Sequence, residues 1–315
     1  MTVLITGQAG YIGSHVALEL TNTGACDFIG IDNLHRGLLS NNHGPCIIAD
    51  IRNKEDVNKI FDEYDIKAVI HMAALTSVPE SMEKKDEYME VNVEGTENII
   101  KAMKAHNCNK LIFSSTASIY EQSQKPVKET DPIQPLNNYA LSKKFAEDFI
   151  KSNKDWLNAV IFRYFNVIGY DENYDVTREY EKTNIVPAFL RTLMHGKDFK
   201  VFGNGYPVKR ENPNDHTCVR DYVDVRDIAK AHVLALEYLT DFKGQNLFNL
   251  GTKHGYSVLE LIDAFNKANN CDIQYTIEKP RKGDPASVVA DNQKAKELLN
   301  WQPTYSIEQS LKVVD

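Results

Sequence analysis

Two side chains four residues apart, Tyr139 and Lys143, are the pair in this sequence best suited to chemistry. Residues with that spacing share one face of a helix, so a phenol and an ammonium group would lie together. The positive charge is expected to lower the phenol pKa from its ordinary value of about 10. Such a pair could take a proton from a sugar hydroxyl while a nicotinamide takes the hydride. Thr116, which follows the apolar residues 111–113, would lie at the edge of a strand near this pair.

A second pattern, Gly7-x-x-Gly10-x-x-Gly13, follows the apolar residues 3–5 and opens a helix-like segment. Glycines at this spacing allow a tight turn and bring backbone close to a pyrophosphate at a helix N-terminus. Asp32 closes the next apolar run, where a carboxylate would bind the adenosine ribose and favour NAD over NADP. Arg36 nearby keeps NADP open, and Asp50, after the third run, could accept from the adenine amino group.

The elements that would position these groups alternate along the first half of the chain. Short runs that are apolar on successive residues indicate strands buried on both faces of a parallel sheet; they are residues 3–5, 28–31, 46–48, 68–70, 111–113 and 160–162. Amphipathic segments predict helices at residues 14–23, 54–64, 91–105, 139–152, 227–239 and 257–268. We therefore predict an α/β fold with a doubly wound, Rossmann-type parallel sheet and a smaller α+β lobe.

The predicted boundary falls near Gly169, where the alternation ends. Residues 1–168 would form the NAD-binding domain and residues 169–315 the substrate lobe, with part of 220–250 returning to the main sheet. Residues 170–182 and 203–214 are polar and turn-rich, as long functional loops are.

Bulk composition excludes several classes of protein. The chain has 315 residues, a net charge of −8 and no long basic run, which argues against nucleic acid and anionic membrane as partners. The five cysteines show no metal-binding or disulfide spacing, and His15, His71 and His106 are isolated, so we expect no metal site. Without a signal peptide or a membrane-length apolar stretch, a soluble cytoplasmic protein is predicted.

At this point the sequence resembles the extended short-chain dehydrogenase/reductases and, within them, the UDP-galactose (UDP-glucose) 4-epimerases. The resemblance covers nearly the whole chain. The motifs that carry it are Thr6-Gly7-x-x-Gly10-Tyr11-Ile12-Gly13-Ser14-His15, Asp32-Asn33-Leu34, His71-Met72-Ala73-Ala74, Asn92-Val93-x-Gly95-Thr96, Phe113-Ser114-Ser115-Thr116, Tyr139-x-x-x-Lys143, Arg163-Tyr164-Phe165-Asn166, Phe202-Gly203-Asn204, Val219-Arg220-Asp221-Tyr222 and Arg281-x-Gly283-Asp284.

The resemblance implies a mechanism with a transient 4-ketose. Tyr139 would take the proton of the sugar 4-hydroxyl while the hydride at C4 passes to tightly bound NAD, and the ketose would turn before the hydride returns to its other face. Lys143 would hold the nicotinamide ribose and keep the Tyr139 phenol acidic, and Thr116 would bind the 4-oxygen.

The resemblance also assigns binding residues. For NAD it implies Gly7, Gly10, Tyr11, Ile12, Gly13, Asp32, Asn33, Asp50, Ile51, Ala73, Asn92, Ser114, Tyr139, Lys143 and Tyr164. For the UDP-sugar it implies Thr76, Ser77, Thr116, Tyr139, Asn166, Asn184, Ile185, Phe202, Arg220, Tyr222, Arg281, Asp284 and Val288. The two arginines suit a diphosphate because their forked donors bind oxyanions in pairs.

The chain departs from the family pattern at three places. Thr76 stands where many relatives carry a lysine, and Glu121 replaces a common glycine. Ser287 and Val288 are small where relatives restricted to glucose and galactose hold a tyrosine, so the pocket is predicted to admit a 2-N-acetyl group, as in UDP-GlcNAc and UDP-GalNAc.

Rival functions remain within this fold. Sugar-nucleotide dehydratases place an Asp-Glu pair where this chain has Ala117 and Ser118, and UDP-glucuronate decarboxylases place a glutamate there, so both are disfavoured. Epimerases of uronates, pentoses or dTDP-sugars stay open. A non-catalytic NAD sensor would typically lose Tyr139 or Lys143, and this chain keeps both.

The predicted helices 91–105 and 139–152 are apolar on more than one side, whereas a surface helix needs one apolar stripe. We therefore predict that they pair across a two-fold axis in a homodimer, as in relatives. The apolar residues are Val93, Ile99, Ile100, Met103, Phe145 and Phe149.

Overall fold

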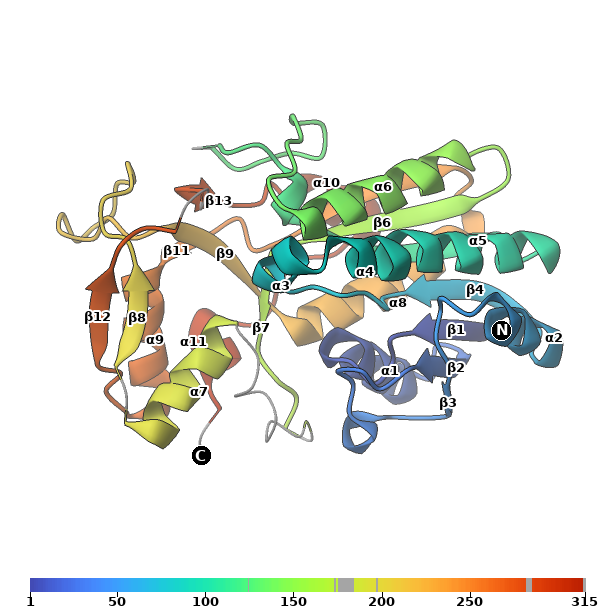
Figure 1. Ribbon diagram of the computed structural model, residues 1–315, viewed down its shortest axis with the longest axis horizontal. Helices are drawn as coiled ribbons and strands as arrows, with labels where there is room; N and C mark the ends of the chain where they lie inside the picture. The colour runs from blue at the N-terminus through green and yellow to red at the C-terminus, as the bar shows by residue number, and fades with distance from the viewer. Residues whose placement is uncertain (124, 173, 175–183, 197, 282–284, 314–315) are drawn as a thin grey trace.

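A parallel sheet forms the centre of the larger part of the molecule (Figure 1). The computed structural model describes residues 1–123, 125–172, 174, 184–196, 198–281 and 285–313. Within them the sheet has seven strands in the order β10-β6-β5-β4-β1-β2-β3, and every neighbouring pair is parallel. The strands are β1 (Thr2–Thr6), β2 (Asp27–Asp32), β3 (Cys46–Ile48), β4 (Ile66–His71), β5 (Lys110–Thr116), β6 (Asn158–Tyr164) and β10 (Gln245–Leu250).

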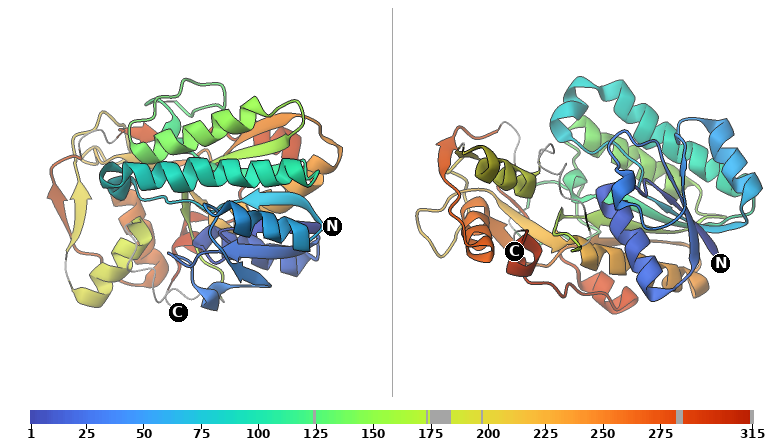
Figure 2. Two further views of the ribbon diagram at one scale, coloured as in Figure 1. Left: turned by 45° about the vertical axis from the view of Figure 1, so that its right-hand side comes forward. Right: turned by 90° about the horizontal axis from the view of Figure 1, so that it is seen from below.

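Helices cover both faces of this sheet, which confirms the predicted doubly wound fold. One face packs on α1 (Tyr11–Thr23) and α8 (Val225–Asp241), which share a buried core with β1, β4 and β6. The other packs on α2 (Lys54–Glu63), α5 (Gly95–Ala105) and α6 (Asn138–Ser152). Figures 1 and 2 both show α5 and α6 side by side. The shorter helices are η1 (Leu39–Asn41), α3 (Val78–Glu83), α4 (Lys85–Met89), η3 (Ala117–Ile119) and α10 (Gln293–Leu299).

The segment predicted as one helix from residue 91 has a different start. A π-helical turn, η2 (Glu90–Glu94), joins α4 to α5, so the helical course already begins at Lys85. The side chain of Asn92, in this turn, donates from Nδ2 to the Leu75 carbonyl and to Ser142 Oγ, and its Oδ1 accepts from Leu75 N. The wide turn thus ties the loop after β4 to α6.

A smaller set of elements packs beside the end of the main sheet at which β5 and β6 finish (Figure 2). Strand β9 (Val219–Asp224) pairs with β7 (Asn166–Ile168), β11 (Gly255–Ser257) and β13 (Ser287–Val288). Strand β8 (Phe199–Phe202) pairs with β12 (Tyr275–Glu278). These strands pack with α7 (Ile185–His195), α9 (Val258–Asn269) and α11 (Ile307–Leu311) around Phe189 and Phe265. In the described residues, no helix combines the length and the apolar character that crossing a bilayer requires.

Candidate active site

The loop between β1 and α1 requires glycine at positions where a side chain would collide with the backbone. Gly7 has φ +73°, and a Cβ added there would lie 2.8 Å from the Ala73 nitrogen. A Cβ on Gly13 would lie 2.1 Å from the Gly7 carbonyl oxygen, so no other residue fits that place. Gly10 is the N-cap of α1 and has no side chain with which to cap the first-turn N–H groups. Such a turn suits an anion held by backbone donors and by the positive end of the helix dipole.

Asp32 is fixed to this loop. Its Oδ2 accepts from Ala9 N at 3.1 Å and its Oδ1 from Leu34 N at 2.8 Å. Burial raises the pKa of Asp32, and these two backbone hydrogen bonds oppose the rise. The carboxylate therefore lies beside the loop, in the place where a dinucleotide fold presents an acid to a ribose.

The two polar residues expected near the adenine are bonded to each other. Asn33 Nδ2 donates to Asp50 Oδ2 at 3.0 Å, and Arg52 donates to the same carboxylate through Nε and Nη2 at 3.0 and 2.7 Å. This forked contact holds the pKa of Asp50 well below its usual range. Asp50 is thus an ionised acceptor at neutral pH.

Tyr139, Lys143 and Thr116 come together where α6 meets the end of β5. Thr116 caps η3, and its hydroxyl hydrogen-bonds with the partly buried phenol of Tyr139. Lys143, 3 % exposed, donates from Nζ to the Ser114 carbonyl at 2.7 Å and lies 4.8 Å from the Phe113 ring centroid. A phenol, a hydroxyl and an amine therefore meet at one strand end, the usual place for a site in such sheets.

The prediction that the pKa of Tyr139 is lowered is wrong for the protein alone, without a bound molecule. Burial raises the pKa of Tyr139, and the hydrogen bond with Thr116 opposes this rise without cancelling it. Burial also lowers the pKa of Lys143 to about 7, against the influence of Glu147. Attraction to an ammonium favours the phenolate, but both groups also lose water on burial, and this loss has the larger effect on their pKa values.

Tyr164 joins the same strand end to α8 through a chain of hydrogen bonds. Its hydroxyl lies 2.8 Å from both Ser114 Oγ and His232 Nε2, and His232 Nδ1 lies 2.8 Å from the Ile228 carbonyl. Because a carbonyl can only accept, Nδ1 carries the proton, Nε2 accepts from Tyr164, and Ser114 donates to Tyr164. Burial lowers the pKa of His232 to about 4, so this direction holds at neutral pH.

His71, at the end of β4, is a second buried histidine that is hydrogen-bonded at both ring nitrogens, like His232. Its Nδ1 lies 2.6 Å from Thr6 Oγ1 and its Nε2 lies 2.9 Å from Thr96 Oγ1. Thr96 donates to the Asn92 carbonyl, so it accepts from Nε2, and Nδ1 accepts from Thr6. Burial lowers the pKa of His71 to about 3, and the facing charge of Lys143 contributes to the shift. This neutral imidazole therefore connects β1, which leads into the glycine loop, to the first turn of α5.

Four of the residues predicted to bind the sugar nucleotide form two local pairs in the smaller lobe. Arg220 and Val288 are register partners on β9 and β13. Val288 also packs on the apolar cluster that contains Ala117, next to Thr116. Separately, the Arg281 guanidinium lies 3.9 Å from the Phe202 ring centroid.

Other predicted residues have structural contacts of their own. Asn166 is exposed and pairs with Tyr222 between β7 and β9. Asn184 is the N-cap of α7 and Ile185 its first residue. Ser77 caps α3, directly after Thr76. Asp284 lies outside the described residues. The Tyr11 hydroxyl donates to the Gly169 carbonyl at 2.5 Å, so its side chain connects α1 to the smaller lobe.

Sequence reasoning missed a buried charged group behind this site. Glu147 on α6 is fully buried and is bonded to Arg163 and Ser115. The signal was present, because Glu147 continues the four-residue spacing from Tyr139 and Lys143.

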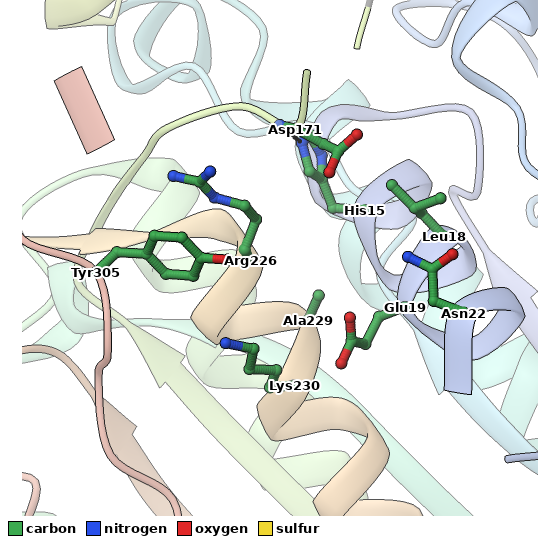
Figure 3. A pocket seen from close by; sticks show the side chains of 9 residues that line it. All are labelled: His15, Leu18, Glu19, Asn22, Asp171, Arg226, Ala229, Lys230 and Tyr305. Carbon is green, nitrogen blue, oxygen red and sulfur yellow. Dashed lines mark hydrogen bonds between the residues drawn. The ribbon is translucent and has the colours of Figure 1, made fainter. Parts of the chain in front are cut away.

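A small surface cavity of about 140 Å³ lies elsewhere, between α1 and α8 (Figure 3). Its two cations have partners, since Arg226 donates twice to Asp224 and Lys230 pairs with Asp227. None of its lining residues belongs to the predicted site, so this cavity lies apart from Tyr139, Lys143 and Thr116.

Comparison with known proteins identifies the family of the chain. The model of the NAD dependent epimerase/dehydratase family matches residues 3–251. The chain is 37 % identical to a UDP-glucose 4-epimerase of Lactobacillus helveticus, over 97 % of this chain and 93 % of that protein. It is 35 % identical to the human UDP-glucose 4-epimerase, over 97 % and 93 %.

Solved structures are similar over the same extent. The UDP-glucose 4-epimerase of Bifidobacterium longum, in complex with NAD+ and UDP, has a TM-score of 0.88 and 35 % identity, covering 99 % of this chain and 96 % of that one. The UDP-Glc/GlcNAc 4-epimerase of Campylobacter jejuni has a TM-score of 0.82 and 33 % identity, covering 98 % and 97 %.

Proposed function

This chain belongs to the NAD dependent epimerase/dehydratase family, and we propose that it is an NAD-dependent 4-epimerase of UDP-sugars that interconverts UDP-glucose and UDP-galactose. The observation that carries the proposal is the meeting of Tyr139, Thr116 and Lys143 at the end of β5. A phenol bonded to a threonine hydroxyl can exchange a proton with a secondary alcohol held between them. The chain's similarity to UDP-glucose 4-epimerases supports the choice of substrate.

The residues fit NAD. The cradle of Gly7 and Gly13 has no room for side chains, α1 begins without a side-chain cap, and Asp32 is fixed beside the loop. When bound, NAD would supply the hydride acceptor that carbon oxidation needs. We propose that it is held by the glycine loop with Tyr11 and Ile12, by Asp32 and by the other predicted residues; these are Asn33, Asp50, Ile51, Ala73, Asn92, Ser114, Tyr139, Lys143 and Tyr164.

Tyr139 would act as the base and the acid of the reaction. Its raised pKa makes the phenolate a strong base, but leaves little phenolate at neutral pH. Lys143, whose pKa of about 7 lies near the working pH, would share the proton of this pair. Thr116 would hold the oxygen that loses and regains the proton. The apparent pKa values of activity would therefore belong to the pair.

The smaller lobe would bind the nucleotide. We propose that residues 1–168 hold the cofactor and 169–315 hold UDP, with Arg220 and Arg281 on the diphosphate and Phe202 near the base. The remaining contacts proposed for the UDP-sugar are Thr76, Ser77, Asn166, Asn184, Ile185, Tyr222, Asp284 and Val288.

The sugar pocket is proposed to accept N-acetylated sugars. Val288 is a small residue beside the apolar cluster next to Thr116, so a 2-N-acetyl group would have space there. A structure similar to this chain is named a UDP-Glc/GlcNAc 4-epimerase. Turnover of UDP-glucose with none of UDP-GlcNAc at saturating concentration would contradict this part.

A homodimer through α5 and α6 is also proposed. Ile99, Ile100 and Met103 lie inside the core of the chain, so they do not serve a partner. Phe145 on α6 is 44 % exposed and Phe149 is partly exposed, which leaves an apolar strip for a second copy. Light scattering should give twice the 35.7 kDa chain mass, and a Phe145→Glu variant should give the monomer.

The central experiment is a turnover assay. Protein unfolded after purification should release NAD, and intact protein should convert UDP-galactose to UDP-glucose, read by product separation. Tyr139→Phe should lose about 10²–10⁴-fold in kcat, because it removes the acid–base group. Released NAD without turnover of any UDP- or dTDP-sugar would refute the proposal and favour a cofactor sensor.

A further inference from the structure

A fully buried carboxylate stands directly behind the proposed site. Glu147 Oε1 accepts from Ser115 Oγ at 2.6 Å and from Arg163 Nε at 2.9 Å, and its Oε2 accepts from Arg163 Nη2 at 2.7 Å. Lys151, on the solvent side, donates to Oε2 at 3.0 Å. Glu147 is thus bonded to α6, β5 and β6 at once.

The partners of Glu147 are the chain neighbours of the reacting residues. Ser115 immediately precedes Thr116 on β5, and Arg163 immediately precedes Tyr164 on β6. Ser115 and Arg163 are register partners, as are Thr116 and Tyr164. One carboxylate therefore fixes α6 against the two strand ends from which the site is built.

Glu147 also belongs to a row of ionisable side chains on α6. Tyr139, Lys143, Glu147 and Lys151 follow at intervals of four residues and so share one helical face. Lys143 and Glu147 are both almost fully buried, at 3 % and 0 % exposure. The Glu147 carboxylate, one helical turn away, raises the pKa of Lys143 against the larger effect of burial, because a nearby negative charge favours the ammonium form.

Stability alone gives a weak reason for such a pair. Burying a carboxylate and a guanidinium costs solvation that their attraction often fails to offset, and apolar residues of similar volume can replace them without loss. A role in orientation or in setting the charge of Lys143 accounts for the cost.

We propose that Glu147 is a positioning residue of the site: clamped by Arg163 and Ser115, it sets the placement of α6, and it supplies the counter-charge that keeps Lys143 an ammonium beside Tyr139. The inference rests on the proposed epimerase function. The other ionisable groups around Lys143 are His71 from β4 and Tyr139 on its own helix, while Arg163 and Tyr164 on β6 and Lys151 on α6 flank Glu147 or Tyr139.

The test uses four variants. E147Q removes the charge but leaves Arg163 buried without a counter-ion, so it can fail to fold. E147Q/R163M removes both charges and keeps the volume, E147D keeps the charge, and K151Q alters the exposed partner as a control. For each we would measure thermal unfolding, KM and kcat for UDP-galactose from pH 5.5 to 9.5, and the Kd of NAD over the same range by calorimetry on NAD-stripped protein.

We expect E147Q/R163M to fold, to keep KM within about two-fold, and to lose about ten-fold in kcat. The alkaline limb of its activity, where the pair of Tyr139 and Lys143 loses a proton, should move to lower pH by about one unit. E147D and K151Q should keep the limb of the unaltered protein. The pH dependence of NAD affinity should shift in the same variants, because Lys143 is a proposed cofactor contact.

An unaltered pH profile and kcat in E147Q/R163M would overturn the inference, as would an equal shift in E147D. If E147Q/R163M does not fold, E147D decides, since a charge-preserving variant with a moved limb contradicts the counter-charge role. If the unaltered protein turns over no sugar nucleotide, the proposed function fails, and the NAD titrations alone decide whether Glu147 acts on Lys143.

Discussion

The two faces of the β5–β6 strand pair hold the site in different ways. On the α6 face, Ser115 and Arg163 are bonded to the ionised carboxylate of Glu147. On the α8 face, Ser114 is bonded to the Tyr164 hydroxyl, which in turn is bonded to the neutral imidazole of His232. The charged face anchors α6, the helix that carries Tyr139 and Lys143, the groups proposed to react, while the neutral face orients hydroxyl groups. Neighbouring residues of two strands thus give a strong, charge-dependent support and a weaker, direction-dependent one.

A substitution that breaks the charged face should have the largest effect on stability. Glu147→Ala would leave the Arg163 guanidinium, 2 % exposed, without its carboxylate. We expect the free energy of unfolding to fall by about 3–5 kcal/mol, as for other buried pairs that lose one partner. Urea unfolding at pH 7.5 measures it, with E147Q/R163M as the matched control. A loss of equal size in the control would show that packing, not charge, is responsible.

Breaking the neutral face should cost less. His232→Leu keeps the apolar contacts with Phe162 but leaves the Tyr164 hydroxyl without its acceptor. Because Tyr164 keeps its hydrogen bond with Ser114, we expect the free energy of unfolding to fall by about 0.5–1.5 kcal/mol, the usual value of one hydrogen bond, in the same experiment. Tyr164→Phe added to His232→Leu should recover part of the loss, and a further full loss would contradict the chain of hydrogen bonds.

The two faces should also differ in their response to mild acid. His232 has a folded-state pKa of about 4 and an unfolded value near 6.5, so the unfolded chain binds more protons between these limits. The stability that His232 provides is complete above pH 6.5 and is lost as pH falls towards 4, at about 1.4 kcal/mol per pH unit. The free energy of unfolding, measured at pH 7, 6 and 5, should therefore fall more steeply with decreasing pH in the unaltered protein than in His232→Leu. If the free energy of unfolding fell equally with pH in both proteins, His232 would not be held neutral in the folded state.

The smallest effect is expected at the outer end of the charged row. Lys151 is 46 % exposed, and its contact with Glu147 is screened by water. Lys151→Gln should change the free energy of unfolding by less than about 1 kcal/mol. A larger loss would show that Lys151, and not Arg163, is the main counter-ion of Glu147.

Much of the fold could be predicted from local pattern. Continuous apolar runs indicated the six strands β1 to β6. Strands buried on both faces do not alternate, although the edge strand β3 keeps such a run with Ile48 exposed. Helix ends were less well predicted: the helix expected from residue 14 begins at Tyr11, because a glycine N-cap gives no polar signal. Helix α7 was missed, since it follows a polar stretch and carries Pro187 in its first turn.

The site was predictable as residue types but not as energetics. Tyr139, Lys143 and Thr116 could be chosen from spacing and from position after a strand. The direction of the Tyr139 pKa could not, because burial depends on tertiary packing. The four-residue spacing after Lys143 pointed to Glu147, but its partners Ser115 and Arg163 could not be read from it. These partners, like the Tyr164 partner of His232, are fixed by the folding of the sheet, which no local window of sequence contains.

The π-helical turn at Glu90–Glu94 has a consequence for how this chain tolerates length changes. Such a turn contains one residue more than an α-helical turn, so deleting a residue within it would close it into ordinary α-helix and change the position of Asn92. Asn92 would then lose its hydrogen bonds with Leu75 and Ser142, which connect the loop after β4 to α6. Homologues and engineered forms should accept insertions in the surface loops far more readily than a single deletion here.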